Sequence, residues 1–438
     1  MPSTENSKNS TTEKQIAMFS IHSDPLSCLG SQQSGGQNLY VLSLAEELSK
    51  LGWKIDVFTR WDNPRKKQIA NINKDARVIR LKGGKVGYIT KTELMDVLPE
   101  IYRNFLIFIN DQNPYSLFHG HYWDGGWTAL AAYLQFKEPL VTNFHSLGIV
   151  RIETRKRYLK NEEDRKYFSK RFNIENEIIK NSALIISLAE TEKQDLHRLY
   201  GCPFEKVMVI PGGVDLKIWS RLDKKKAREE LNFKEDDFIL LYVGRFEWRK
   251  GIGTLTSAAS LLKNDIPNLK VLIVGGQIFG QQKNPEDYKE YKRLSKKVKE
   301  EQVENIVRFT GRINNSRLPI FYSASNILVV PSYYEPFGLV ALEGMASKIP
   351  VIASDVGGLA STIKNNENGL LFEPRNPVRL KEKVLMIYNS NELAEKLVQN
   401  AYEDVKKYSW KLIAKKVSDI YKELIFTNKN ENSSNSSI

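Results

Sequence analysis

Short apolar runs alternate with helix-length amphipathic segments along most of the chain. In the first half, the apolar runs predict strands at residues 16–21, 54–59, 117–119, 140–143 and 183–187. Residues 37–51 have the period of an amphipathic helix. Strands that are apolar throughout and separated by helices are typical of parallel sheets buried on both faces.

The second half repeats this alternation. Its apolar runs predict strands at residues 238–243, 269–274, 306–310, 327–330, 351–353 and 370–372. Between the two series, Pro211, Gly212 and Gly213 interrupt the pattern and mark a domain junction. We therefore predict an α/β protein of two doubly wound, Rossmann-like domains, residues 15–210 and 211–409, facing each other across a cleft. Ligands of such sheets bind beyond the carboxyl ends of the strands.

The two ends of the chain differ in composition from the rest. Residues 1–14 and 428–438 are rich in Ser, Thr, Asn, Glu and Lys, which predicts disordered tails. Residues 410–425 carry apolar side chains at helical spacing and predict a last amphipathic helix. The N-terminal segment lacks the hydrophobic stretch of a signal peptide.

The composition excludes several classes of protein. Of the 438 residues, 41% are hydrophobic and 27% are charged, which is too apolar for a disordered chain. No apolar run reaches about 18 residues, so we expect no membrane span. Two cysteines, Cys28 and Cys202, argue against a disulfide scaffold or a zinc site and suit the cytosol. The net charge of +13 fits nucleic acid, an anionic surface or anionic substrates, but no nucleic-acid motif accompanies it.

A long loop, residues 22–36, separates the first predicted strand from the first predicted helix. Connections of this kind usually have about two to six residues, and longer ones are commonly functional. The loop ends with Gly35 and Gly36 at the expected helix N-terminus, where free N–H groups favour an anion. The loop has neither a G-x-G-x-x-G fingerprint nor a P-loop, and a plain flexible turn is the alternative interpretation.

Two cations follow the strand predicted at residues 238–243. Arg245 and Lys250 lie in a strand-to-helix loop bounded by Gly244 and Gly251. Positive charges placed in this way can flank a diphosphate through charge-assisted hydrogen bonds. A surface turn with solvated basic side chains is the alternative.

Residues 331–345 contain two carboxylates on either side of a predicted helix N-terminus. Pro336 forces Glu335 out of helical geometry, and Glu343 falls in the second turn of a helix that starts near Gly338. The N–H groups expected to face the cleft belong to Phe337, Gly338 and Leu339. Such an array suits a nucleotide sugar, with carboxylates for hydroxyls and N–H groups for phosphate. The alternative interpretation is that Glu343 stands near the helix N-terminus because a negative charge there interacts favourably with the helix dipole.

The five histidines fall into three groups. His121 and His145 each follow a predicted strand. We therefore expect His121 to point into the cleft and His145 to help form the acceptor side of the cleft. We interpret His22 and His119 as structural and give His197 no role. Since no cysteine or carboxylate stands near them at ligand spacing, we predict no metal site.

These segments are similar, in the same order, to the motifs of retaining glycosyltransferases of the GT-B fold, family 4. Glu335 and Glu343 match the E-x7-E motif. The other matching segments are residues 35–40, 119–126, 144–148, 211–215 and 243–251. The resemblance covers residues 15–425. Within the family, the chain resembles the branch of sucrose-phosphate synthases, mannosylfructose-phosphate synthases and mycothiol-pathway N-acetylglucosaminyltransferases.

The resemblance implies how a nucleotide-sugar donor would be held. Arg245 and Lys250 would bind the diphosphate and stabilise it as it leaves, and Gly35 and Gly36 would offer it backbone N–H groups. Arg312 would lie near the base.

The resemblance also implies contacts to the two sugars. Glu335 would bind hydroxyls of the donor sugar, Glu343 those of the ribose, and His121 would lie beside the reacting centre. The residues mapped to the acceptor are Asn38, Lys91, Tyr122, His145, Ser146 and Arg171. Ser146 stands where the family has threonine and keeps the hydroxyl.

The resemblance implies a cytoplasmic retaining hexosyltransferase that uses a nucleotide sugar, with UDP-sugar as the first choice, and a small phosphorylated sugar or polyol. No cofactor or metal is expected, since Arg245 and Lys250 can stabilise the leaving charge. The helix at residues 410–425 would cross back onto the N-terminal domain. Alternatives are a lipid or cell-surface polysaccharide acceptor, a sugar-nucleotide epimerase of the same fold, and a binding protein with an inactive site. The sequence leaves the donor base and oligomeric state open.

Overall fold

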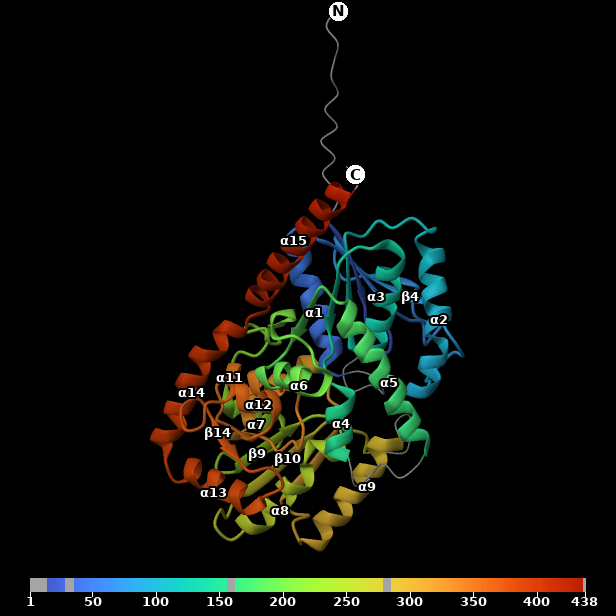
Figure 1. The fold of residues 1–438 in the computed structure, drawn as a ribbon. Helices are drawn as coiled ribbons and strands as arrows, with labels where there is room; N and C mark the ends of the chain where they lie inside the picture. Colours follow the sequence, from blue (N-terminus) through green and yellow to red (C-terminus); the bar gives the residue numbers. More distant parts are fainter. Residues whose placement is uncertain (1–13, 28–34, 156–161, 279–284, 436–438) are drawn as a thin grey trace, which may run out of the picture.

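The computed structural model describes residues 14–27, 35–155, 162–278 and 285–435. Figure 1 shows two lobes, one formed by the first half of the chain in blue to green and the other by the second half in yellow to orange. Each lobe is built around one sheet. The predicted pair of Rossmann-like α/β domains is confirmed.

The sheet of the first lobe has eight strands in the order β3-β4-β2-β1-β5-β6-β7-β8. Their bounds are β1 Gln15–Phe19, β2 Lys54–Arg60, β3 Ile69–Asn71, β4 Ala76–Leu81, β5 Leu117–His121, β6 Leu140–Asn143, β7 Leu184–Ser187 and β8 Val207–Val209. Only β3, at the edge, pairs antiparallel among these described strands. In β1, Ile16 and Met18 belong to one hydrophobic core, and Ala17 and Phe19 belong to another on the opposite face.

The helices of the first lobe connect these strands. Their bounds are α1 Gly36–Lys50, α2 Lys91–Phe108, α3 Tyr122–Phe136, α4 Gly148–Arg155, α5 Glu162–Asn181 and α6 Glu190–Tyr200. The start of α2 is fixed by a capping box. The Thr90 hydroxyl accepts a hydrogen bond from the Glu93 N–H, and the Glu93 carboxylate accepts one from the Thr90 N–H. This cap places Lys91 at the first position of the helix.

The sheet of the second lobe has six parallel strands in the order β11-β10-β9-β12-β13-β14. Their bounds are β9 Phe238–Val243, β10 Leu269–Val274, β11 Val307–Gly311, β12 Ile327–Val330, β13 Val351–Ser354 and β14 Leu370–Phe372. These bounds agree with the sequence predictions to within one residue, because every strand of this sheet except the edge strand β11 is a nearly continuous buried apolar run.

The helices of the second lobe flank this sheet. Their bounds are α7 Lys224–Glu230, α8 Ile252–Leu262, α9 Pro285–Glu300, α10 Leu318–Ala324, α11 Leu339–Ala346, α12 Gly357–Thr362, α13 Pro377–Tyr388 and α14 Asn391–Val405. The described residues also contain short 3-10 segments at Phe204–Lys206, Trp248–Lys250, Asn315–Arg317 and Lys406–Tyr408.

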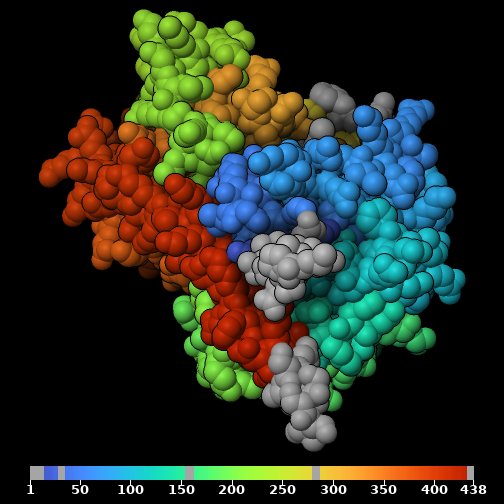
Figure 2. All heavy atoms as spheres, turned by 90° about the horizontal axis from the view of Figure 1, so that it is seen from above, coloured from blue at the N-terminus to red at the C-terminus, as the bar shows by residue number. Residues whose placement is uncertain are grey.

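The two connections between the lobes lie side by side. Val214 donates its N–H to the Tyr408 carbonyl at 2.8 Å and forms a parallel bridge with Ser409. The second connection leads into α15 (Trp410–Asn435), which returns to the first lobe and lies along α1 (Figure 2). Trp53 Nε1 donates to Ser418 Oγ at 2.9 Å, and this bond ties α15 to the residue that directly precedes β2.

The C-terminal helix corrects one sequence prediction. Residues 428–435 are the end of α15 and not part of a disordered tail. Asn428 Nδ2 donates to Glu138 Oε2 at 3.3 Å, so the helix still contacts the first lobe beyond residue 425. Residues 1–13 and 436–438 of the predicted tails lie outside the described residues.

Three strands of the first lobe have no counterpart in the sequence predictions: β3, β4 and β8. In β4, arginines interrupt the apolar pattern. Arg77 forms an ion pair with Asp56 of β2 at 2.6 Å, and Arg80 forms one with Asp24 at 2.9 Å. These charges are tolerated in the strand because each has a partner from a distant segment.

Candidate active site

A cavity of about 1890 Å³ lies between the carboxyl ends of the two sheets. Its walls come from the loops after β1, β5 and β6 in the first lobe and after β9, β11 and β12 in the second. This is the usual ligand position in open α/β sheets. With the exception of His121, every residue that the sequence proposed for the site lines this cavity.

The loop after β9 brings a largely buried ion pair to the cavity. Lys250 Nζ lies 2.5 Å from Glu335 Oε2, and their side chains are 17% and 12% exposed. Ser332 Oγ also donates to Glu335, at 3.3 Å. Burial opposes ionisation of Glu335, but Lys250 and Arg249 outweigh it and lower the pKa of the carboxyl. Glu335 is therefore held as a carboxylate, ready to accept hydrogen bonds from hydroxyl groups.

The carboxylate of Glu247 holds the two arginines of this loop. Arg245 Nη2 and Arg249 Nε each lie 2.6 Å from a different oxygen of the Glu247 carboxylate. Burial would raise the pKa of Glu247, but the arginines outweigh it and lower the pKa well below its usual value. Sequence reasoning missed Glu247 and Arg249, although both stand between Arg245 and Lys250. The loop thus presents three cations held by two carboxylates.

The Glu335 loop continues into α11 as predicted. Gly338 is the residue before the helix and has a left-handed φ of 89°, where a Cβ would lie 2.5 Å from Leu359 Cδ2. Glu343 is in the second turn and accepts a hydrogen bond from the Tyr322 hydroxyl at 2.6 Å. Burial raises the pKa of Glu343 to about 7. Phe337 and Leu339 line the cavity beside this helix end.

The glycines at the start of α1 face the second lobe. A Cβ on Gly35 would lie 3.8 Å from Arg245 Nε, and one on Gly36 would lie 3.4 Å from Leu339 Cδ1. The predicted role of Gly35 as a free N–H donor needs correction, because its N–H donates to Asn38 Oδ1 at 2.8 Å. Residues 28–34 of this loop, Cys28 included, lie outside the described residues.

Arg312 lies at the end of the cavity that the strands β10 and β11 border. Its Nη2 is 3.7 Å from Asp287 Oδ2, at the start of α9. Burial raises the pKa of Asp287 to about 6. The sequence predicted Arg312 but gave no signal for Asp287, which is distant along the chain.

On the first lobe, three cations meet at the hydroxyl of Tyr122. Arg171 Nη1 donates to it at 2.7 Å, and Lys91 Nζ and Arg151 Nη1 each donate at 3.1 Å. Arg171 is fully buried and forms an ion pair with Glu175 at 2.7 Å. The structure thus brings the predicted residues Lys91, Tyr122 and Arg171 together. Arg151 was missed because it begins a charge-rich segment that resembles a solvated helix face.

The histidine predictions need a correction. Strand β5 extends to His121, two residues beyond the predicted end, so His119 and His121 project from the same face of the sheet with rings 4.2 Å apart. His121 is fully buried and does not line the cavity, contrary to prediction. Its Nδ1 lies 3.1 Å from Nε2 of His145, which does line the cavity.

The remaining histidines are held by neighbours. His119 has a structural role, as predicted, because its two ring nitrogens lie 2.6 Å from the Tyr421 hydroxyl and 2.8 Å from Asn143 Oδ1. His22 also lines the cavity, where its Nδ1 is 2.8 Å from Asp124 Oδ2. The sequence predicts a structural role for His22, and the structure places the residue at the cavity wall, in contact with Asp124.

Two other predicted acceptor residues are tied into the protein. Asn38 accepts a hydrogen bond from Ser23 Oγ at 2.6 Å and donates one to the Asp24 carbonyl at 2.7 Å, so its side chain orders the loop after β1. Ser146 offers its carbonyl to Arg171, while its buried hydroxyl lies near the Tyr334 phenol of the other lobe. Ser146 therefore marks the contact between the lobes.

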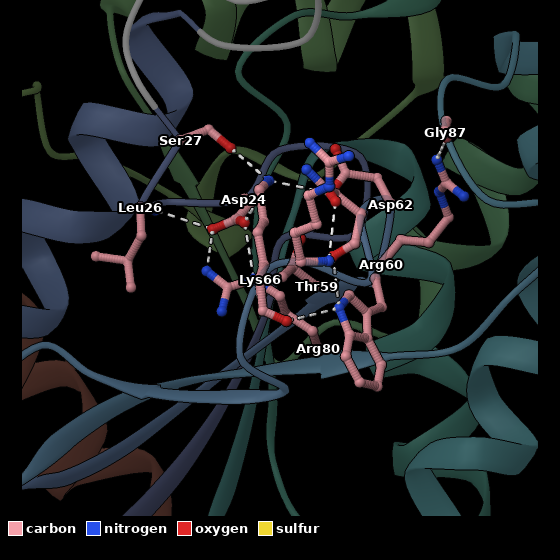
Figure 3. A network of polar contacts seen from close by, with 12 residues as sticks. Asp24, Leu26, Ser27, Thr59, Arg60, Asp62, Lys66, Arg80 and Gly87 are labelled. Carbon is pink, nitrogen blue, oxygen red and sulfur yellow. Dashed lines mark hydrogen bonds and ion pairs between the residues drawn. The ribbon is translucent and has the colours of Figure 1, made fainter.

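A polar network braces the cavity wall of the first lobe (Figure 3). Asp24 Oδ2 accepts from Arg80 Nε at 2.9 Å and from Lys66 Nζ at 3.0 Å. Arg60 donates to the carbonyls of Gly83, Lys85 and Gly87. The bonds to Asp24 hold the loop after β1, and the bonds from Arg60 hold the segment that leads to Lys91. The network thus positions both from outside the cavity.

Within the described residues, no group of three or more His, Cys, Asp and Glu side chains is placed to hold a metal ion. No helix in these same residues is both long enough and apolar enough to cross a bilayer.

Known proteins share this architecture. Residues 34–218 match the family described as Glycosyltransferase Family 4, and residues 223–404 match the one described as Glycosyl transferases group 1. The D-inositol 3-phosphate glycosyltransferase of Corynebacterium glutamicum (strain R) is 30% identical over 417 residues, which cover 94% of this chain and 97% of that protein.

Solved structures agree. Sucrose-phosphate synthase from Thermosynechococcus elongatus superposes with a TM-score of 0.86 and 35% identity, covering 95% of this chain and all of that one. Anabaena HepE, solved in complex with UDP, shares the fold at a TM-score of 0.71 and 18% identity, covering 94% of this chain and all of that one. The chain therefore belongs to the group 1 glycosyltransferases, family 4, with the GT-B fold.

Proposed function

We propose that the protein transfers a hexosyl unit from a nucleotide sugar, with a UDP-sugar as the first choice, to a small phosphorylated sugar or polyol in the cytoplasm, with retention of anomeric configuration. One observation carries this proposal. Two separate cationic clusters face the same cavity, Arg245 with Lys250 on one lobe and Lys91 with Arg171 on the other. One cluster suits a donor diphosphate and the other an acceptor phosphate.

The names of the relatives support this choice of substrates. The relative from Corynebacterium glutamicum is named for inositol 3-phosphate, a phosphorylated polyol, and the Thermosynechococcus elongatus protein is a sucrose-phosphate synthase. Both names describe a phosphorylated product or acceptor. Lys91, Tyr122 and Arg171 supply the hydrogen-bond donors that a phosphoryl group requires.

The proposed reaction breaks the bond between the anomeric carbon of the sugar and the diphosphate. The acceptor hydroxyl forms the new bond on the same face, and its proton passes to an oxygen of the leaving diphosphate. Arg245 and Lys250 stabilise the charge that develops on that diphosphate. Glu335 would hold the sugar hydroxyls, and His145, which lines the cavity in place of His121, would lie beside the transferred group.

A screen of substrates tests this function. We expect only one of UDP, ADP and GDP to raise the melting temperature. At a concentration of 100 times its dissociation constant, that nucleotide should raise the free energy of unfolding by about 2.7 kcal/mol. With the matching donor, product should form with a phosphorylated sugar or polyol and not with the same compound lacking phosphate. Transfer to a lipid or polysaccharide alone, or epimerisation of the donor sugar, would contradict the proposal.

We expect turnover to persist after treatment with EDTA. The reason is that Arg245 and Lys250 place fixed positive charge where the diphosphate departs, the task that a metal ion performs in other enzymes. Initial rates with and without chelator measure this. Complete loss of activity that is restored by added magnesium or manganese would contradict the metal-independent part of the proposal.

We expect Glu343→Gln to raise the donor Michaelis constant and to change turnover little, because its proposed ribose contact is the same before and during the reaction. Burial raises the pKa of Glu343 to about 7, so the wild-type carboxyl becomes protonated as the pH falls through that value. The wild-type Michaelis constant should therefore rise below about pH 7, whereas that of the variant should vary little. Steady-state kinetics measure both effects.

The exposed residue Glu367, outside the cavity, supplies the control variant Glu367→Gln, which should behave as wild type. If Glu343→Gln lowers only turnover, the assignment of Glu343 to the ribose is wrong.

A further inference from the structure

The ion pair between Lys250 and Glu335 joins the loop after β9 to the loop after β12, and the backbones of these loops touch beside it. Gly251, the residue after Lys250, has a left-handed φ of 65°. A Cβ at this position would lie 1.8 Å from the carbonyl oxygen of Pro331, which is closer than a side chain can come. Glycine therefore allows the two loops to meet at this point.

Two hydrogen bonds join the same loops at the residue before Lys250. The Tyr333 N–H donates to the Arg249 carbonyl at 2.7 Å, and Arg249 Nη1 donates to the Tyr334 carbonyl at 3.1 Å. The residues on either side of Lys250 are thus both fixed to the segment that leads to Glu335.

The side chain of Tyr333 packs against the loop of Lys250 from outside the cavity. A Cβ on Gly251 would lie 3.0 Å from Cε1 of its ring, and its hydroxyl is 3.0 Å from Thr254 Oγ1 in the first turn of α8. Its ring also meets the Trp248 ring edge to face, with the ring centres 5.0 Å apart. One side chain therefore contacts the chain both before and after Lys250.

Arg375 lies against both aromatic rings. Its Cζ is 5.1 Å from the centre of the Trp248 ring and 4.9 Å from that of the Tyr333 ring. Arg375 comes from the connection between β14 and α13, so it ties a third segment to the two loops. We call Trp248, Tyr333 and Arg375 the outer cluster, since all three stand outside the lining of the cavity.

The position of Lys250 matters for the rate. A lysine ammonium sits on a flexible four-carbon stem, so its place depends on the backbone that carries it and on its partner Glu335. A fixed charge stabilises a transition state only where the new charge develops, and a misplacement of about 1 Å can cost about 100-fold in rate. The contacts that fix this loop can therefore affect the reaction without touching a substrate.

We propose that Tyr333 is a positioning residue, which holds the loop of Lys250 against the loop of Glu335 and thereby sets the place of the Lys250 ammonium for the departing diphosphate. The inference rests on the proposed function, in which Lys250 stabilises that diphosphate. A tyrosine that served the fold alone would contribute to stability. A positioning tyrosine contributes to the rate, and it does so through Lys250.

The first test compares Tyr333→Leu, Tyr333→Phe and the matched control Tyr402→Leu. Tyr402 is a half-buried tyrosine of α14 outside the cavity, and its ring also faces a cation, Lys348 Nζ at 4.2 Å. Turnover is measured with UDP-, ADP- or GDP-glucose as donor and a hexose 6-phosphate or inositol 3-phosphate as acceptor. Tyr333→Leu should lower turnover by about 10- to 100-fold, with a smaller change in the donor Michaelis constant. Tyr333→Phe, which keeps the ring, should retain most of the turnover, and Tyr402→Leu should match wild type.

The second test asks whether Tyr333 acts through Lys250. It measures the residual turnover of Lys250→Ala and of the double variant Lys250→Ala with Tyr333→Leu. In the absence of Lys250, the tyrosine change should lower turnover by less than about threefold, because the group that it positions is missing. A purely structural role predicts the same factor with and without Lys250.

Thermal melting shows whether each variant is folded. If Tyr333→Leu does not fold, the exposed change Arg375→Gln takes its place and should lower turnover by a smaller factor, again only when Lys250 is present. Wild-type turnover in the folded variant, a loss in Tyr333→Phe as large as in Tyr333→Leu, or equal losses with and without Lys250 would overturn the inference and leave the proposed function intact. If the wild type transfers no hexosyl unit from any of these donors, the proposed function fails, and the positioning role fails with it.

Discussion

Replacing Lys250 with alanine is expected to lower turnover by about 100- to 1,000-fold, with a much smaller effect on the donor dissociation constant. Negative charge builds on the diphosphate as the bond to the sugar breaks. A fixed cation at that point interacts more strongly with the transition state than with the bound donor, so the loss falls on turnover. Arg245→Ala should behave in the same way, since Arg245 lines the same part of the cavity.

The structure adds a second reason for a large effect at Lys250. Its ammonium group is 2.5 Å from the largely buried carboxylate of Glu335, so the variant leaves that carboxylate without its nearest cation. Thermal melting must therefore accompany the kinetics, to separate lost turnover from lost fold. Lys396→Ala, an exposed change on α14, is the control and should match wild type. A variant of Lys250 that changes only the Michaelis constant would show that our assignment of this residue is wrong.

Replacing Arg171 with methionine is expected to lower the free energy of unfolding by about 3–5 kcal/mol. Arg171 and Glu175 are paired at 2.7 Å, and their side chains are 1% and 0% exposed. Removing the guanidinium leaves a buried carboxylate without its cation. The variant also loses the hydrogen bonds from Arg171 to Tyr122 and to the carbonyl of Ser146.

Two further variants separate these contributions. Lys170→Met changes the adjacent exposed residue of α5 and should alter stability little. The double variant Arg171→Met with Glu175→Gln should recover part of the loss, because it removes the unpaired charge. Denaturant unfolding of the four proteins measures the free energies. If the double variant is no more stable than Arg171→Met alone, the buried carboxylate is not the cause.

The proposed donor side of the site could be predicted because its residues are neighbours along the chain. Arg245 and Lys250 share one loop, and Glu335 and Glu343 share one strand-to-helix segment. Local rules that concern proline, helix starts and strand ends were sufficient to place them. The same holds for the strands of the second lobe, whose buried apolar runs are visible in the sequence.

The proposed acceptor side depends on contacts between distant segments. Lys91, Tyr122, Arg151 and Arg171 come from four helices, and only the packing of those helices brings them to one oxygen. Arg151 looked like part of a solvated face because its partners are far away in the sequence. A charge pattern alone does not distinguish a solvated arginine from one that lines a cavity.

The length of one strand decided which histidine reaches the cavity. Side chains alternate between the faces of a strand, and β5 continues to His121, so this ring is buried beside His119 while His145 lines the cavity. The sequence by itself determined the two domains, the cleft between them and the donor loops, because apolar period and turn residues act locally. Only the tertiary structure decided the cluster of cations around Tyr122, the strand β4 and the path of α15, because ion pairs and hydrogen bonds between segments far apart in the chain stabilise them.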